Sequence, residues 1–157
     1  MLAEALQTSA SYFTKGQFHA AEEICRQALG MEPENPNFIY LLANILNGQK
    51  KFDEAEVEFR HAISIKPDHA FAYYSLGKLL WGQGKDDEAI PQYKTAINLK
   101  PDFIEAYYDL AVIFKNRGRI NEVVSLYERA VKFEPDNQVR LSELVNFSYA
   151  ACAWGGH

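Results

Sequence analysis

An all-α fold is predicted by this sequence, as a solenoid of antiparallel helix pairs stacked one after another. Apolar residues recur at helical spacing between Ala70 and Pro101, and Gly84 divides them into two sets, which is the pattern of two amphipathic helices joined by a tight turn. The pattern then repeats along the chain, because prolines recur every 34 residues, at Pro33, Pro67, Pro101 and Pro135. A period of this length is typical of stacked helical units.

The period divides the chain into equivalent segments. We expect a single domain over residues 1–157, in which each repeat supplies a first and a second helix. Apolar residues continue at the same spacing beyond the last proline, so a further helix should cap the stack. The predicted repeats are 2–35, 36–69, 70–103 and 104–137, and the predicted terminal helix is 138–152.

Small residues recur at two positions of the repeat and predict close packing of the paired helices. A side chain larger than alanine at such a contact would push the helix axes apart. The eighth position of the first helix holds Ser9, Ala43, Gly77 and Ala111. The twentieth position, in the second helix, holds alanine in three repeats, Ala21, Ala55 and Ala89, and the larger Val123 in the fourth.

Two local departures from the repeat are expected to alter the structure slightly. Glycine separates the two helices at Gly16, Gly84 and Gly118, but Lys50 takes this place in the second repeat, where we expect a modified turn. Pro91 lies inside the second helix of the third repeat, where it should distort the helix locally.

Composition excludes several classes of protein. A formal charge of −5 and a pI near 5.4 provide no basic field for nucleic acid or for an anionic membrane surface. No apolar run approaches the roughly 20 residues of a membrane-spanning helix, and no signal-type segment begins the chain, so a cytoplasmic protein is expected. Cys25 and Cys152 suggest neither a disulfide framework nor a zinc site.

No arrangement of residues typical of an enzyme is found. The four histidines, which we expect to be exposed to solvent, lack the spacing of a metal site. Acidic pairs such as Asp53-Glu54 lie early in second helices, where carboxylates stabilise the helix dipole. We therefore predict a non-catalytic protein that uses no cofactor and no metal.

The period and the small residues at fixed offsets resemble the tetratricopeptide repeat (TPR) family, from Leu2 to Pro135. The resemblance implies a right-handed superhelix and a concave groove lined by one face of the first helices. That face carries positions two, five, nine and twelve of each repeat, with a tyrosine at position five of three repeats. The residues implied to line the groove are Asn37, Tyr40, Asn44, Asn47, Phe71, Tyr74, Lys78, Trp81, Glu105, Tyr108, Asp109 and Lys115.

The groove residues favour binding of a peptide or protein partner. Tyrosine and tryptophan rings provide contact area at low entropic cost, and asparagines pair with an extended backbone. The alternative is that the tyrosines stack on neighbouring repeats and stabilise the solenoid without a ligand; Trp81 could likewise pack into the turn between helices.

Two known kinds of groove are disfavoured. The carboxylate clamp of chaperone-binding members needs cations where this sequence has Glu105 and Asp109, and only Asn44 matches its pattern. An RNA-reading groove is disfavoured because Lys78 and Lys115 are offset by the same two acids.

Two further hypotheses concern the parent chain and its assembly. Residues Asn98 to Phe103, together with Cys152-Ala153-Trp154, are similar to the repeat region of O-linked N-acetylglucosamine transferase-type glycosyltransferases, which would make the chain the substrate-recognising arm of a larger enzyme. The apolar residues Phe147, Tyr149 and Trp154 instead suggest a scaffold that self-associates through its C-terminal end.

Overall fold

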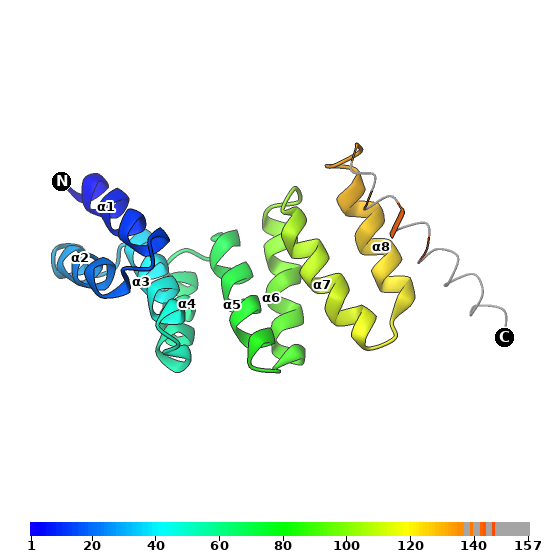
Figure 1. Cartoon of the computed structure of the whole chain (residues 1–157), viewed down its shortest axis with the longest axis horizontal. Helices are drawn as coiled ribbons and strands as arrows, with labels where there is room; N and C mark the ends of the chain where they lie inside the picture. The colour runs from blue at the N-terminus through cyan, green and yellow to red at the C-terminus, as the bar shows by residue number, and fades with distance from the viewer. Residues whose placement is uncertain (137–138, 140–141, 144–145, 147–157) are drawn as a thin grey trace.

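The computed structural model describes residues 1–136 together with Val139, Ser142, Glu143 and Asn146. Over these residues the chain is all-α, with no strand. The terminal helix predicted over 138–152, and the apolar C-terminal end proposed for self-association, lie outside the described residues for the most part. The helices are α1 (Leu2–Thr14), α2 (Phe18–Met31), α3 (Pro36–Gly48), α4 (Phe52–Ile65), α5 (Ala70–Gly82), α6 (Asp86–Leu99), α7 (Ile104–Asn116) and α8 (Ile120–Val131) (Figure 1).

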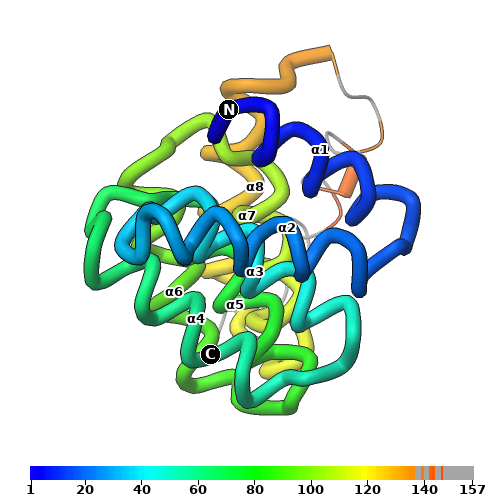
Figure 2. The backbone as a smooth tube through the Cα atoms, turned by 90° about the vertical axis from the view of Figure 1, so that its left-hand side faces the viewer, coloured from blue at the N-terminus to red at the C-terminus, as the bar shows by residue number. Residues whose placement is uncertain are grey.

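Consecutive helices form antiparallel pairs that stack into a solenoid, as predicted. The closest packing joins α1 to α2, α3 to α4, α5 to α6 and α7 to α8, and each second helix also packs on the first helix of the next pair. The first helices α1, α3 and α5 contact one another as well. Seen along the stack, the pairs lie one behind the next (Figure 2). The first helices therefore share one face of the molecule.

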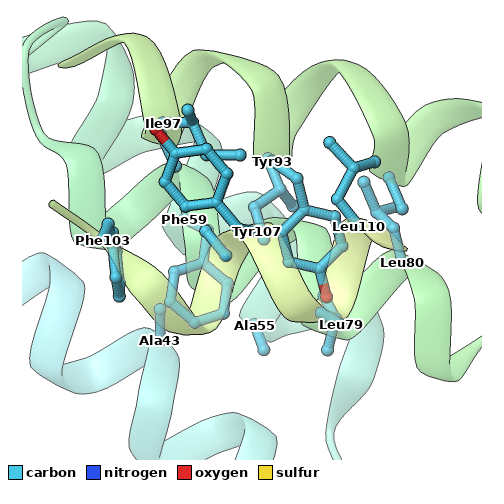
Figure 3. Close-up of a cluster of buried hydrophobic side chains, with 14 of the residues drawn as sticks. Ala43, Ala55, Phe59, Leu79, Leu80, Tyr93, Ile97, Phe103, Tyr107 and Leu110 are labelled. Atoms are coloured by element: carbon cyan, nitrogen blue, oxygen red, sulfur yellow. The ribbon is translucent and has the colours of Figure 1, made fainter. Parts of the chain in front are cut away.

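The small residues predicted at the eighth and twentieth positions lie in the core. Ala43, Ala55 and Ala89 have no exposed surface, and a Cβ atom added at Gly77 would lie 3.3 Å from the Tyr93 ring. Large rings fill the space that these residues leave. Tyr93 is itself fully buried and packs with Ile97 and Leu110 in the cluster between α6 and α7 (Figure 3). Large and small side chains interlock through the stack.

The turn of the second repeat is unaltered, so the expectation of a modified turn at Lys50 was wrong. Lys50 has a φ of 63°, close to the 73° and 74° of Gly16 and Gly84. Its amide donates to the Asn47 carbonyl at 3.0 Å, as the Gly84 amide donates to the Trp81 carbonyl at 2.9 Å. The hydrogen bonds of the turn thus hold a lysine in the left-handed conformation that glycine adopts at lower cost.

Prolines mark the ends of the pairs. Each of the four periodic prolines lies just beyond the end of a second helix, where proline stops helical hydrogen bonding. Pro91 does not shorten its helix, since α6 spans 14 residues as α2 and α4 do.

Candidate protein-binding face

A row of three tyrosines runs along the first-helix face. Tyr40 in α3, Tyr74 in α5 and Tyr108 in α7 are each half-buried. Each ring packs on an aromatic ring of the second helix in its own pair, with ring centroids 5.5–6.0 Å apart; the pairs are Tyr40–Phe59, Tyr74–Tyr93 and Tyr108–Tyr127. This tyrosine row is therefore anchored in the core and leaves part of each ring at the surface.

The tyrosine row also bridges neighbouring helix pairs. The centroid of the Tyr40 ring lies 4.7 Å from that of the His69 ring, and the Tyr40 hydroxyl lies 3.2 Å from Ser75 Oγ in α5. The centroid of the Tyr74 ring lies 4.6 Å from that of Phe103, the residue before α7. The tyrosines thus join neighbouring helix pairs, as the alternative interpretation required.

A polar cluster lies at the centre of the face, around Asp109. Its carboxylate lies near the hydroxyls of Tyr74 and Tyr93, and burial together with this negative charge raises the pKa of both phenols. Burial also raises the pKa of Asp109, against the opposing effects of Tyr74 and Lys78. Asp109 Oδ2 and the Tyr93 hydroxyl are buried without a hydrogen-bond partner among the described residues. Both atoms are shielded from solvent, so the polar cluster lies beneath the surface of the face.

Lys78 is the cation nearest to this cluster. Its Nζ lies 5.5 Å from the centroid of the Tyr74 ring, within the range of a cation–π contact. Phe71 is 47% exposed and packs on Phe103 with 5.1 Å between ring centroids. The middle of the face is therefore an aromatic surface beside a buried carboxylate.

The other predicted residues lie on the same three helices in less distinctive settings. Asn44 donates from Nδ2 to the Tyr40 carbonyl at 2.8 Å, so part of its amide is used within α3. Trp81 is half-buried against the core, in line with the packing role considered for it. Asn47 is half-buried, and Asn37, Glu105 and Lys115 are exposed.

The rings that hold the tyrosine row in place, His69 and Phe103, were not predicted from the sequence. His69 and Phe103 occupy one repeat position, just before α5 and α7, and alignment of the repeats would have shown that both are rings. The expectation of exposed histidines was wrong for His69, which is half-buried and accepts the Ala72 amide at Nδ1, 3.3 Å away, as the N-cap of α5. His19 and His61 are exposed, and His157 lies outside the described residues.

The described part of the chain contains no cluster of three potential metal-binding side chains. None of its helices is both long enough and apolar enough to cross a bilayer.

Family models identify the class of protein. Tetratricopeptide repeat models match residues 12–80 and 104–137, and a TPR repeat model matches residues 82–118. The chain therefore belongs to the tetratricopeptide repeat family, whose members generally serve as interaction modules. No curated protein sequence gives a significant match.

Solved TPR structures share the fold at low sequence identity. MamA is 25% identical, with a TM-score of 0.77 over 85% of this chain and 78% of MamA. YrrB, a TPR protein with an unusual peptide-binding site, is 18% identical, with a TM-score of 0.72 over 93% of this chain and 76% of YrrB.

A glycosyltransferase is also among the structural neighbours. A mutant of Thermobaculum terrenum O-GlcNAc transferase is 23% identical, with a TM-score of 0.73 over 82% of this chain but 26% of the transferase. This likeness shows the fold alone. The similarity noted at Cys152-Ala153-Trp154 lies outside the described residues.

Proposed function

We propose that the chain is a non-catalytic interaction module whose first-helix face binds an extended segment of a partner protein. The observation that carries the proposal is the tyrosine row, whose rings are anchored in the core and keep part of their surface exposed. Aromatic rings provide contact area at low entropic cost, and the half-buried ring of Tyr74 would pack on the apolar part of the ligand.

The chemistry of this face sets the kind of segment that it would bind. Asp109 and Glu105 disfavour a ligand carboxylate, so we propose that a donor side chain or backbone amide approaches the cluster. YrrB, a TPR protein with an unusual peptide-binding site, supports peptide binding on this fold in general. In this proposal the chain needs no cofactor.

The test removes two rings of the tyrosine row. Tagged wild-type chain and the Tyr74→Ala, Tyr108→Ala double variant are used to capture partners from lysate of the source cells, and the affinity for each captured protein is then measured by calorimetry. We expect the double variant to bind at least about tenfold more weakly, because truncated aromatic anchors typically cost more than 1 kcal/mol each.

The control removes two exposed aromatic side chains that lie outside this face. Phe52 and Phe133 are 42% and 45% exposed, so the Phe52→Ala, Phe133→Ala variant should bind as the wild type does. Circular dichroism must show equal helicity in all three proteins. Full retention of every partner by the tyrosine variant would reject the first-helix face as the binding surface.

A further inference from the structure

Ion pairs close the first two junctions between helix pairs in the same way. In α2, Glu22 binds Arg26 one turn later at 2.8 Å, and its Oε2 lies 3.7 Å from Lys51 Nζ of the next pair. One repeat further on, Glu56 in α4 is the equivalent residue. A carboxylate at this repeat position thus joins a cation of its own helix to a cation across the junction.

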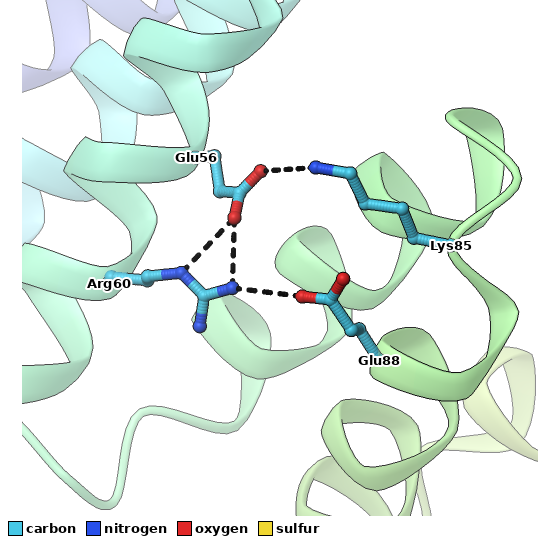
Figure 4. A network of polar contacts seen from close by, with 4 residues as sticks. All are labelled: Glu56, Arg60, Lys85 and Glu88. Atoms are coloured by element: carbon cyan, nitrogen blue, oxygen red, sulfur yellow. Dashed lines mark hydrogen bonds and ion pairs between the residues drawn. The ribbon is translucent and has the colours of Figure 1, made fainter.

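The second junction shows the arrangement clearly. Glu56 lies 2.9 Å from Arg60 and 3.2 Å from Lys85, and Arg60 also reaches Glu88 at 3.6 Å (Figure 4). Both cations that face the junction therefore have a carboxylate partner.

The third junction, between the α5–α6 and α7–α8 pairs, keeps the cations but lacks the central carboxylate. Ile90 stands where Glu22 and Glu56 stand in the earlier repeats. Lys94 and Arg119 occupy the places of the two junction cations, and they lie over the Phe114 ring, 5.9 Å and 4.5 Å from its centroid. Arg119, the residue before α8, pairs with Glu122 of that helix at 2.6 Å. Lys94 has no ion pair or hydrogen bond among the described residues.

A cavity of about 250 Å³ lies at this junction, between α6, α7 and α8. Its floor is apolar, because Ile97, Leu110 and Phe114 there are at most 2% exposed. Its rim carries a further cation, Arg129, which lies 5.2 Å from the centroid of the Tyr107 ring and also has no ion pair among the described residues. Three cations thus surround the cavity against the single carboxylate of Glu122.

We infer that this cavity, the third-junction pocket, binds a glutamate or aspartate side chain of a partner protein that carries an apolar residue beside it. The partner's carboxylate would take the place of the glutamate that the repeat lacks here, between Lys94 and Arg119. Its apolar neighbour would cover the floor. The pocket shares no residue with the first-helix face, so this inference does not depend on the function proposed for that face.

A carboxylate is favoured over other anions for two reasons. The same fold satisfies the equivalent cations with a carboxylate at both earlier junctions. The volume of the pocket also suits one side chain, and small-molecule sites usually begin near 300 Å³. The net charge of −5 works against an extended polyanion.

The inference is tested by NMR titration of the full ¹⁵N-labelled chain. The probe is the capped peptide acetyl-Gly-Leu-Glu-Phe-Glu-Gly-amide, and its counterpart has glutamine at both glutamate positions. We expect the acidic peptide to shift backbone amides around Ile97 and Ser125. The glutamine peptide should bind at least about tenfold more weakly, since hydrogen bonds to a charged group are stronger than those between neutral groups. Equal binding of the two peptides would overturn the inference.

Variants locate the binding and guard against misfolding. Ile90→Glu supplies the missing carboxylate from within the chain and should weaken peptide binding about tenfold, whereas Ile90→Gln, of nearly equal size, should not. Lys94→Gln should weaken binding, and the exposed Lys15→Gln should leave it unchanged. Wild-type affinity in both Ile90→Glu and Lys94→Gln would contradict the assignment, as would displacement of the peptide by an equal concentration of inorganic phosphate.

Discussion

His69 shows how one residue joins the stability of the stack to the tyrosine row. Its neutral Nδ1 accepts the Ala72 amide at the start of α5 while its ring packs on Tyr40. Burial, aided by the charge of Lys66, lowers the pKa of the imidazole below its ordinary value of 6.5. A protonated ring would lose the acceptor and bring a charge into a half-buried site.

A pH dependence of stability follows from this shift. Between the folded-state pKa of His69 and its unfolded-state pKa of about 6.5, the unfolded chain binds more protons than the folded chain. The contribution of His69 to stability is therefore fully present above about pH 6.5 and is lost as the pH falls through the folded-state pKa. We expect the free energy of unfolding, measured with urea at pH 7.5 and pH 5.5, to fall less in His69→Asn than in the wild type, because asparagine caps without titrating in this range.

The exposed His19 provides the control for this experiment. His19→Asn should keep the pH dependence of the wild type. An unchanged dependence in His69→Asn would refute the role given to this cap.

At the scale of single residues, the sequence predicted which side chains share the first-helix face but not their partners. The tyrosine spacing was sufficient to place Tyr40, Tyr74 and Tyr108 on one face. The rings that hold them, His69 and Phe103, lie in the turns between repeats, where helical periodicity gives no information. The polar cluster around Asp109 also depends on the tilt between neighbouring helices, which a repeat period does not specify.

At the scale of the element, the turn at Lys50 shows that hydrogen bonding within the repeat overrides residue preference. The left-handed conformation costs a non-glycine residue about 1–2 kcal/mol, and glycine loses about 0.5–1 kcal/mol through greater freedom in the unfolded chain. The turn forms nonetheless, because the helices on both sides fix it.

Replacing this lysine should therefore stabilise the protein. We expect Lys50→Gly to raise the free energy of unfolding by about 0.5–1 kcal/mol, the difference between those two costs. Lys15 precedes the equivalent turn of the first repeat with a φ of −84°, so Lys15→Gly should instead lower stability by a similar amount. Urea denaturation of both variants tests the argument, and loss of stability in Lys50→Gly would contradict it.

At the scale of the whole molecule, burial is uneven along the stack. Within α1, Ser9 is the one buried residue, whereas α3 buries seven residues and α5 buries six. The first helix has a neighbouring pair on one side only, so it gains less from packing than the helices inside the stack do.

Hydrogen exchange should report this gradient. We expect backbone amides of α1 to exchange at least about tenfold faster than those of α3 and α5 in native buffer, because less burial opposes their local opening. Mass spectrometry of peptides from these helices provides the measurement. Equal protection in all three would show that the stack opens only as a single unit.

The repeat period also explains which features of the whole molecule were predictable. A single alignment at 34 residues was enough to predict paired helices, their small contact residues and the proline stops. The same alignment contains the exception at Ile90, but its consequence depends on Phe114 and Arg129 meeting Lys94 across three helices. Pockets between repeats depend on tertiary contacts that no single repeat encodes.

The neighbour-to-neighbour packing of the helices has a consequence for how fast the native state forms. Among α1 to α8, the extensive contacts join helices that are one or two apart in the chain. No long loop must therefore close, at a cost in entropy, before stabilising contacts can form. Closure of long loops is the step that slows the folding of proteins whose contacts join distant parts of the chain. Folding can begin at any well-packed pair and spread outward, on the microsecond-to-millisecond time scale of helical proteins with local contacts.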